Sequence, residues 1–281
     1  MSSKNSNCMV WEPPLIQPHR IGEINKFGRA RPREKQVSRV FDIDIEQLKA
    51  QYGSPLFVTS ESRLRQNVRQ LKRAFEVRYG NVSHGWSYKT NYISAVCNIM
   101  HQEGSLAEVV SAFEYEKARQ LGVLGEKIIF NGPNKTRKIL ERAIADGAQI
   151  NIDHLDELQL IESVAQGQGR CATVGLRLNF DTGFSEPWSR FGFNIESGQA
   201  HQAAKQVVMS EHLRLKGLHS HIGTFILEPR AYCEQVKIMC KFMRDLEGRE
   251  EVCIYTIDIG GGLPSHNALQ GIYLPPDQVV P

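Results

Sequence analysis

SHGWSYKTN, residues 83–91, ends a short β-prone run, and an apolar pattern of helical period follows it at once. Strand ends and helical segments then alternate along the chain. We expect strands to end near Lys89, Val110, Asn131, Ile152, Asn179, His221 and Ile259. The periodicity predicts helices between these strands at about 92–103, 112–121, 135–146, 155–165, 198–210 and 229–247.

This alternation predicts parallel strands joined by crossover helices, so the expected class is α/β. The architecture is either a doubly wound open sheet or a (β/α)8 TIM barrel. The first four strand ends recur about every 21 residues, and polar or reactive side chains follow many strands instead of gathering at one switch point. Both observations favour the barrel. Seven strands are predicted, whereas a closed barrel needs eight. We therefore expect an incomplete barrel with two open edges.

The residues before the barrel divide into two parts. Residues 1–36 carry four prolines and little periodicity, which is typical of an irregular arm. Beyond about Phe41 the pattern predicts a short helix ended by Gly53, a short strand at 55–58 and a long helix capped by Ser60. We therefore predict an irregular basic arm, residues 1–40, and a barrel domain, residues 41–281.

The composition is that of an ordinary globular protein, with 41% hydrophobic and 23% charged residues among 281. No apolar run approaches the roughly 18 residues of a membrane span, and the N-terminus lacks the apolar core of a signal peptide. Six cysteines occur without a Cys-x-x-Cys pair, which favours a reduced, cytoplasmic protein. No membrane partner is expected.

Positive charge is concentrated at the N-terminus. Residues 1–40 hold eight Lys and Arg against three Glu, a net charge of +5, whereas the other 241 residues hold 26 against 28, a net charge of −2. The near-neutral body argues against a nucleic-acid groove, so no nucleic-acid partner is expected. We interpret the basic arm as a solvated, loosely ordered extension, with an interaction arm as the alternative.

Two of the strand ends carry lysine or histidine. A lysine at the mouth of a strand, such as Lys89, can be held partly desolvated and become nucleophilic, although most lysines are solvated surface groups. In LHSHIGT, residues 218–224, His219 and His221 alternate and share one face. Two core histidines are the alternative interpretation. No metal site is expected, because no third ligand is near in the sequence.

Two further strands carry glycine and arginine. In IDIGGGLP, residues 257–264, three glycines form either a flexible turn or a nest of backbone N–H groups that approaches a phosphate. Their spacing does not match the dinucleotide-binding fingerprint. Arg177 lies inside the apolar strand VGLRLN, residues 174–179, and therefore requires a buried anion or polar partner.

The motifs SYKTN (87–91), HIGT (221–224) and DIGGGLP (258–264) together resemble those of the group IV pyridoxal-phosphate decarboxylases, which comprise the ornithine, diaminopimelate and arginine enzymes. The resemblance spans about residues 41–264. YGSPLFV (52–58) and HSHIG (219–223) are most similar to the diaminopimelate decarboxylases. The resemblance implies the fold type III, alanine-racemase-like barrel with pyridoxal 5′-phosphate as cofactor. In the family a C-terminal β-domain follows, and we expect it to be absent here.

The resemblance also implies roles for individual residues. Lys89 would be the catalytic lysine that forms a Schiff base with the cofactor, and His221 the catalytic histidine that stacks on the pyridine ring. Arg177 would approach the phenolic oxygen, or else form an ion pair inside the barrel. Glu108 stands where the family usually has Asp. The positions implied at the phosphate are Thr224, Gly260, Gly261 and Gly262.

Two further stretches are similar to family motifs. NGPNK (131–135) matches a Gly-Pro-x-Lys turn, and SRFG (189–192) matches a Ser-Lys-Phe-Gly loop with one substitution. We interpret Lys135 as a helix-start or surface residue without a catalytic role. The family's Glu-Pro-Gly-Arg segment, whose Glu partners the pyridine nitrogen, has no match in residues 265–281.

The resemblance therefore predicts the barrel portion of an amino-acid decarboxylase of the diaminopimelate, ornithine or arginine type. We expect it to be weak or inactive alone, because the acidic partner of the pyridine nitrogen is missing. An amino acid is the expected substrate, and a homo-oligomer, a dimer in the family, is the expected assembly. Two alternatives stay open: a non-catalytic or regulatory homologue that binds the cofactor, and an amino-acid racemase of the same fold.

Overall fold

The computed structural model describes residues 38–184, 190–224, 226–250 and 252–263. The chain divides into two compact units, Met1–Thr59 and Ser60–Pro281. The predicted irregular arm lies outside the described residues up to position 37. The residues after Leu263, including the stretch compared with the family's C-terminal motifs, also lie outside them.

The first unit contains a small hairpin and one short helix. Phe41 and Asp42 both have positive φ, as the tight turn of a two-residue hairpin loop requires. Asp44 then caps the helix by accepting hydrogen bonds from two backbone N–H groups. The elements are β1 (Arg39–Val40), β2 (Ile43–Asp44) and α1 (Ile45–Tyr52).

The strand predicted at residues 55–58 is wrong. No strand forms there, and Phe57 is 97% exposed. The run of apolar residues resembles a strand, but a strand exists only where a neighbour satisfies its backbone hydrogen bonds. No described residue does so here.

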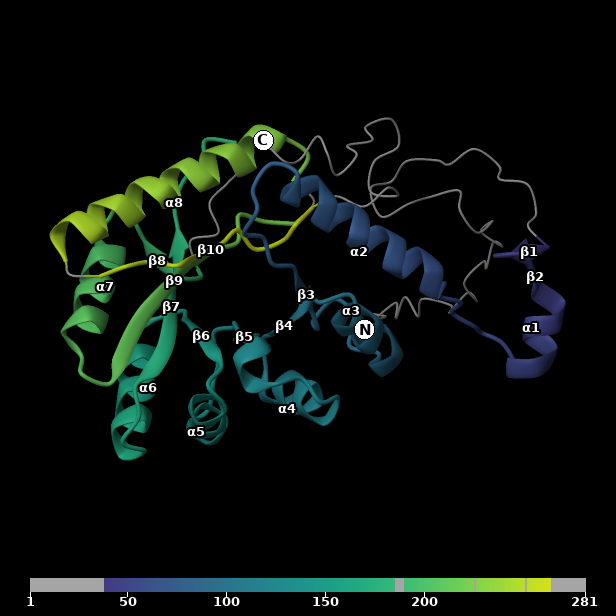
Figure 1. Ribbon diagram of the computed structural model, residues 1–281, viewed down its shortest axis with the longest axis horizontal. Coiled ribbons are helices and arrows are strands. Elements are labelled where there is room, and N and C mark those ends of the chain that lie inside the picture. Colours follow the sequence, from purple (N-terminus) through teal and green to yellow (C-terminus); the bar gives the residue numbers. More distant parts are fainter. Residues whose placement is uncertain (1–37, 185–189, 225, 251, 264–281) are drawn as a thin grey trace, which may run out of the picture. The chain divides into compact units, whose positions relative to one another are not determined.

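A parallel sheet lies at the centre of the second unit (Figure 1). Its strand order is β10-β9-β7-β6-β5-β4-β3, and β8 pairs with the end of β7. The strands therefore follow the chain order, as in a barrel, without reversal at a switch point. The strands are β3 (Gly85–Ser87), β4 (Leu106–Val109), β5 (Ile128–Phe130), β6 (Gln149–Ile152), β7 (Ala172–Asn179), β8 (Phe193–Asn194), β9 (Leu213–Ser220) and β10 (Thr256–Asp258).

This path of seven strands confirms the predicted barrel architecture, and the seven strand ends predicted from Lys89 to Ile259 each lie within two residues of the observed one. Within the described residues, β3 and β10 each pair with a single neighbour, so the two open edges are those predicted. Strand β8 was not predicted, because a strand of two residues has no detectable period.

Helices lie along the outer side of the curved sheet (Figure 1). Two of them begin at a serine cap: the Ser60 hydroxyl accepts from the Arg63 N–H at the start of α2, and Ser111 caps α4 in the same way. The helices are α2 (Glu61–Glu76), α3 (Ser94–Gln102), α4 (Ala112–Gln120), α5 (Arg137–Asp146), α6 (Leu155–Gly167), α7 (Gln199–Met209) and α8 (Pro229–Arg249), with the 3-10 turn η1 (Gly125–Lys127).

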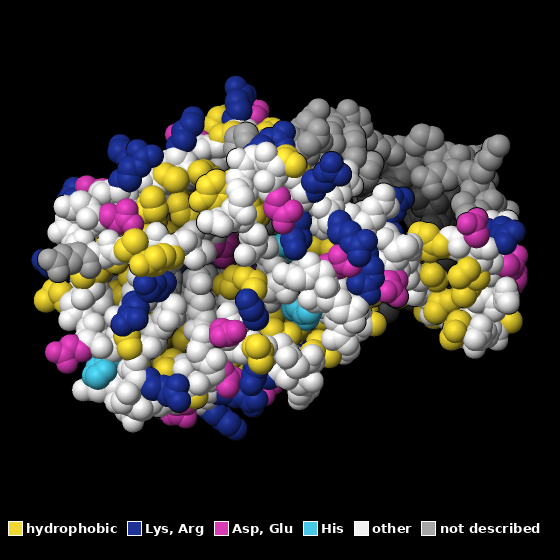
Figure 2. All heavy atoms as spheres, viewed as in Figure 1, with side chains coloured by type: hydrophobic (Ala, Val, Ile, Leu, Met, Phe, Trp, Pro, Cys, Tyr) yellow, Lys and Arg dark blue, Asp and Glu magenta, His cyan; other side chains and the backbone are white. Residues whose placement is uncertain are grey.

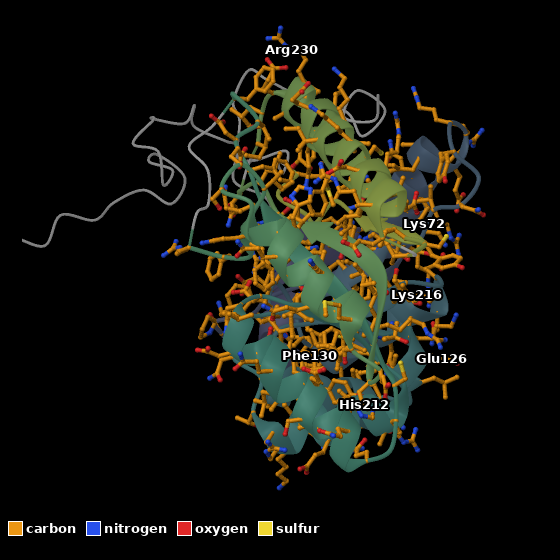
Figure 3. All side chains as sticks on the ribbon, turned by 90° about the vertical axis from the view of Figure 1, so that its left-hand side faces the viewer. Lys72, Glu126, Phe130, His212, Lys216 and Arg230 are labelled. Carbon is orange, nitrogen blue, oxygen red and sulfur yellow. The ribbon has the colours of Figure 1, made fainter. Side chains whose placement is uncertain are left out.

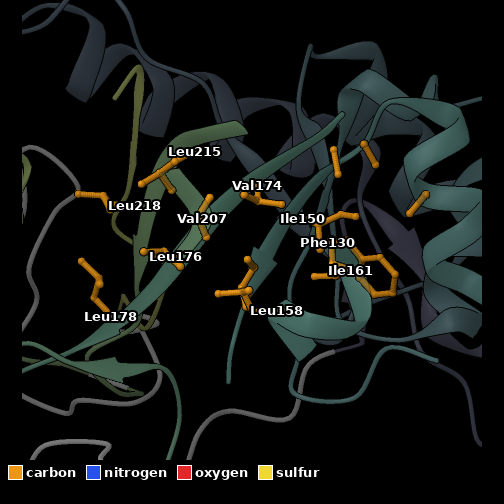
Figure 4. Close-up of a cluster of buried hydrophobic side chains, with 14 of the residues drawn as sticks. Phe130, Ile150, Leu158, Ile161, Val174, Leu176, Leu178, Val207, Leu215 and Leu218 are labelled. Carbon is orange, nitrogen blue, oxygen red and sulfur yellow. The ribbon is translucent and has the colours of Figure 1, made fainter. Parts of the chain in front are cut away.

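The apolar core lies between the sheet and these helices. Alternate residues of the strands from β4 to β9 face the helices and are buried, among them Phe130, Ile150 and Leu176 (Figure 4). Figure 3 shows Phe130 within this layer, whereas Arg230 at the start of α8 points away from it. Burial of these side chains supplies most of the driving force for folding.

The opposite face of the same strands is polar. The alternating positions there include Glu108, Asn131, Asn151, Arg177 and His219, and hydrogen bonds or ion contacts link them across the strands. Barrels of this architecture usually fill their interior with branched apolar side chains. In this chain, by contrast, the face opposite the helices carries polar side chains, and the apolar core lies on the helix side.

Helix α2 packs on α3 through apolar and ionic contacts. Val68 of α2 forms a small buried cluster with Met100 of α3. At the end of α3, Glu103 accepts hydrogen bonds from Arg69 and Arg65 at 2.6–2.8 Å. These guanidinium groups lower the pKa of Glu103 to about 2.

The surface of the second unit is mixed in charge. On the face drawn in Figure 2, basic and acidic side chains are interspersed over this unit. Among the described residues, no helix combines the length and the apolar character needed to cross a membrane.

Candidate functional site

Five strand ends bring the predicted site residues to one edge of the sheet. Because the paired strands are parallel, their carboxyl ends lie along the same edge. Lys89 follows β3, Glu108 lies on β4 and Arg177 on β7. His221 follows β9 directly, and Gly260–Gly262 follow β10. Residues that are far apart in the sequence are thereby gathered into one site.

The end of β3 is anchored on its helix side. Tyr88 is fully buried, and its hydroxyl lies 2.9 Å from His101 Nε2. His101 Nδ1 lies 2.8 Å from the carbonyl oxygen of Ser105. A carbonyl only accepts, so Nδ1 carries the proton and Nε2 accepts from Tyr88. Since successive side chains alternate, this anchor directs Lys89 to the polar face.

Lys89 has an acidic neighbour on the next strand. Its Nζ lies 3.8 Å from Glu108 Oε1, and the lysine side chain is 48% exposed. Ser87 and Glu108 are register partners of β3 and β4, which places the lysine and the carboxylate on one face. The amine of Lys89 is therefore both accessible and close to a counter-charge.

Arg177 has the buried anion that its position in an apolar strand requires. Its guanidinium nitrogen donates to Asp153 Oδ1 at 3.1 Å, and both side chains are largely buried. The guanidinium also lies over the ring of Phe191, 4.6 Å from the ring centre. The interior ion pair, one of the two interpretations of Arg177, is thus present. These contacts with Asp153 and Phe191 hold the guanidinium on the polar face of the sheet.

The two histidines both contact the end of β10. His219 Nδ1 lies 3.0 Å from Asp258 Oδ2, without the alignment of a hydrogen bond. Burial tends to raise the pKa of Asp258, but the charge of His219 and the N–H of Gly260 act against burial and prevail, so that pKa is lowered.

His221 is neutral at neutral pH. Burial, together with the positive charges of Lys89, His219 and Arg177, lowers the pKa of His221 to about 4. The backbone N–H of Gly261 donates to His221 Nδ1 at 3.2 Å, which requires that this nitrogen carry no proton. The ring is therefore held against the glycine loop as an uncharged imidazole.

The glycine loop packs backbone to backbone against the end of β9. Gly260 and Gly262 have φ of +69° and +94°, and a Cβ on either would overlap a carbonyl oxygen, of Ser220 or Gly223 respectively. Gly261 has open space around it. The N–H of Gly260 donates to Asp258 Oδ1 at 2.8 Å. The conformation thus requires glycine at two of the three positions.

Thr224 is exposed in the segment that follows β9. Among the described residues, no group of three or more His, Cys, Asp and Glu side chains is placed to hold a metal ion. In the SRFG stretch, Ser189 lies outside the described residues.

The surface interpretation of Lys135 is wrong. Its side chain is completely buried just before α5, and its Nζ donates to Glu157 Oε1 at 2.8 Å and to two backbone carbonyls. Burial lowers the pKa of Lys135, while Glu157 acts in the opposite direction. Glu157 also accepts from the N–H of Asp153 at 2.7 Å. The buried pair of Lys135 and Glu157 therefore supports the backbone of Asp153, the ion-pair partner of Arg177.

Several polar residues of this edge were not predicted as site residues, namely Asn131, Asn151, Asp153 and Asp258. Asn131 and Asn151 stand 20 positions apart, and only the pairing of β5 with β6 brings them together. One signal was available: a polar residue at the end of several consecutive apolar strands, which on parallel strands predicts a common polar edge.

Known proteins resemble this chain over most of its length. The family model for "Pyridoxal-dependent decarboxylase, pyridoxal binding domain" matches residues 61–271. The diaminopimelate decarboxylase of Methanocaldococcus jannaschii is 30% identical over 78% of this chain and 53% of its own length. That of Bacillus subtilis is 27% identical over 84% and 56%. The chain therefore spans about half the length of the curated relatives it matches.

Solved structures of related enzymes share the fold. The diaminopimelate decarboxylase from M. jannaschii in co-complex with L-lysine aligns with a TM-score of 0.78 and 26% identity, over 86% of this chain and 58% of that one. The lysine/ornithine decarboxylase from Vibrio vulnificus complexed with putrescine aligns with a TM-score of 0.70 and 26% identity, over 84% and 60%. Together with the match over residues 61–271, these likenesses show that the chain belongs to the pyridoxal-dependent decarboxylase family and carries its pyridoxal-binding domain.

Proposed function

We propose that this chain is the cofactor-binding part of an amino-acid decarboxylase that acts on diaminopimelate. The observation that carries the proposal is the gathering, at one sheet edge, of an accessible lysine, a buried arginine, a neutral histidine and a glycine loop. Each of these groups comes from a different strand end. Such a constellation is typical of a catalytic site at the carboxyl face of a barrel.

The residues of this edge fit pyridoxal phosphate. Lys89 offers a half-exposed amine to the cofactor aldehyde. The loop Gly260–Gly262 brings backbone close to a phosphate without side chains in the way, and Thr224 offers a hydroxyl. Arg177 offers a positive charge to the phenolic oxygen from a guanidinium that Asp153 holds in place.

Pyridoxal phosphate, when bound, accepts the electron pair that remains as CO₂ leaves the amino acid. The protein contributes orientation. His221, an uncharged ring fixed by Gly261, offers a flat surface that sets the plane of the cofactor ring. Lys89 would hold the cofactor, and its amine, 3.8 Å from Glu108 Oε1, would hold a proton at the mouth of the site.

Diaminopimelate is the substrate that the relatives favour. Loss of one carboxyl group from diaminopimelate as CO₂ leaves lysine, and a solved relative is titled as a co-complex with L-lysine. The curated relatives described above carry the same name. We expect diaminopimelate to release the cofactor from Lys89 at lower concentration than ornithine or arginine.

The proposal also includes a homo-oligomer, a cytoplasmic location and a barrel domain that begins near residue 41. Within the described residues, the sheet edges at β3 and β10 lack a second neighbour, and open edges of parallel strands favour association. The cysteines that support a reducing compartment are the free thiols Cys97, Cys171, Cys233, Cys240 and Cys253.

The attachment of the cofactor at Lys89 tests the proposed function directly. The protein is incubated with pyridoxal phosphate, reduced with borohydride and mapped by peptide mass spectrometry. We expect the modification on the peptide that contains Lys89, and we expect the Lys89→Arg protein to lack it. The Lys117→Arg protein, altered at a lysine outside the site, serves as the matched control and should be labelled like the wild type. Modification spread over surface lysines, with Lys89 unmodified, would sink the assignment.

A second prediction concerns the glycine loop. Gly262→Ala places a Cβ against the carbonyl of Gly223 at positive φ, which costs about 1–2 kcal/mol in backbone conformation alone. We expect about a tenfold or greater loss of affinity for pyridoxal phosphate. Gly261→Ala has open space and should lose clearly less. Equal losses in the two proteins, measured by equilibrium dialysis, would contradict the role of loop conformation.

A further inference from the structure

A chain of side-chain amides runs along the polar face of the sheet and ends at the carboxylate beside Lys89. Glu108 Oε1 accepts from Asn131 Nδ2 at 2.9 Å. Asn131 Oδ1 accepts from Asn151 Nδ2 at 2.7 Å. Asn151 Oδ1 accepts from Gln149 Nε2 at 3.3 Å. The chain thus links strands β4, β5 and β6 through side chains alone.

The direction of every bond in this chain follows from one charge. An ionised carboxylate only accepts hydrogen bonds, so Asn131 must turn its NH₂ group to Glu108. Its oxygen then faces Asn151, which must donate in turn, and the same holds for Gln149. All three amides therefore point their donors toward Glu108. Hydrogen bonds arranged head to tail in this way polarise and strengthen one another.

The neighbouring strands leave room for the chain. A Cβ on Gly175 of β7 would overlap Asn151 Oδ1, and a Cβ on Gly217 of β9 would lie 3.1 Å from Gln149 Nε2. Neither glycine has positive φ, so backbone conformation does not require glycine at these two positions. The space they leave is occupied by the amides. This steric observation is independent of the hydrogen bonds themselves.

The chain is also buried. Asn131 and Asn151 are 4% and 2% exposed. Burying an amide is unfavourable unless its groups are hydrogen-bonded, and here each amide is bonded within the chain. Glu108 itself has one more rotatable bond than aspartate and is 13% exposed. A longer side chain at the edge of the site needs more contacts to stay in one conformation.

We propose that Asn131 and Asn151 are positioning residues that hold the Glu108 carboxylate beside Lys89 Nζ. The inference rests on the proposed attachment of the cofactor at Lys89 and deepens it. Neither asparagine touches the lysine; Asn131 acts on Glu108 directly, and Asn151 fixes the orientation of the Asn131 amide. The effect on Lys89 is that the counter-charge has a single location, 3.8 Å from Nζ.

The first test uses the cofactor-free protein and is independent of the proposed function. In ¹⁵N–¹H spectra, Glu108→Gln is expected to shift the side-chain amide signals of Asn131 and, through it, of Asn151. The matched control is Tyr115→Phe, which also removes one buried hydrogen bond to a carboxylate, that of Asp146, but on the helix side of the sheet. Tyr115→Phe should leave both amide signals in place.

The second test uses protein loaded with pyridoxal phosphate and follows absorbance against pH. A carboxylate held close to a nitrogen favours positive charge on it. In Asn131→Leu the Glu108 carboxylate is no longer held beside the Lys89 nitrogen. The pH midpoint of the change in cofactor absorbance should therefore fall by about 1 unit. The double variant Glu108→Gln/Asn131→Asp keeps a hydrogen bond between the two positions but moves the charge away from Lys89. The double variant should be more thermally stable than Asn131→Leu, and its absorbance change should keep the lowered pH midpoint.

Each contrary outcome has a defined meaning. If the Asn151 signals do not respond to Glu108→Gln, or respond equally to Tyr115→Phe, then the chain of amides does not couple Asn151 to Glu108. A wild-type transition in Asn131→Leu, or its return in the double variant, overturns the positioning of Glu108. If wild-type Lys89 takes no cofactor, the proposed function fails. The amide signals then still decide whether the chain of amides couples Asn151 to Glu108.

Discussion

Lys135→Met is expected to lower the free energy of unfolding of the cofactor-free protein by about 3–5 kcal/mol. Lys135 has a side chain with no exposed surface, and Glu157, 2.8 Å away, is 2% exposed. Removing the lysine leaves a buried carboxylate without its cation. It also leaves the carbonyl oxygens of Gly132 and Asn151 without the donor that now reaches them.

The comparison with an exposed lysine isolates this cause. Lys138 lies three positions further on, is exposed, and can receive the same substitution. Lys138→Met should change stability by no more than about 0.5 kcal/mol. The double variant Lys135→Met/Glu157→Met removes both charges and should recover part of the loss. Recovery stays incomplete because the N–H of Asp153 loses its acceptor. Urea unfolding at pH 7 measures all four proteins, and equal costs at positions 135 and 138 would contradict the buried ion pair.

Acidification from pH 7 to pH 5 is expected to cost the cofactor-free protein about 2 kcal/mol of stability through His221 alone, and about 3 kcal/mol by pH 4. The pKa of this histidine is about 4 in the folded protein against an ordinary value of 6.5. In the unfolded chain the ring therefore takes up a proton at a pH where the folded protein does not. Stability is present above pH 6.5 and is lost as the pH falls toward 4.

The His221→Phe protein provides the measurement. Phenylalanine keeps a flat ring but cannot take up a proton. Between pH 7 and pH 5 the variant should therefore lose about 2 kcal/mol less stability than the wild type. The groups that face His221 are Lys89, His219, Arg177 and Asp258, and they are unchanged in both proteins. Parallel curves of urea midpoint against pH would show that the ring is not held neutral by its surroundings.

The strands and helices of the second unit were predictable because their periods are strong. In β6 the apolar residues Ile150 and Ile152 alternate with polar ones, and helices such as α5 show a buried face at helical spacing. Parallel pairing then follows from the alternation of strand and helix. The gathering of Lys89, Arg177 and His221 at one edge follows in turn, since each lies at or near the carboxyl end of a strand.

The partners of these residues were not predictable in the same way. Lys135 looks like a solvated lysine because most lysines are, and only the fold supplies Glu157 from a helix 22 positions away. The amide chain depends on the register of β4, β5 and β6, which is a property of backbone pairing. Conversely, residues 55–58 have the local pattern of a strand but no neighbour to pair with among the described residues. Local pattern predicts elements, while long-range pairing determines contacts.

The separation of the two strand faces has a consequence for how such a protein changes over time. Folding stability depends on one set of alternate residues, those that face the helices, and chemistry on the other. Mutations at the second set can therefore accumulate without loss of the fold, provided that hydrogen bonds remain satisfied. Lineages that share this scaffold can diverge in substrate while keeping the outer layer. A library that varies only the inward positions of β4 to β7 would let a designer follow the same route in the laboratory.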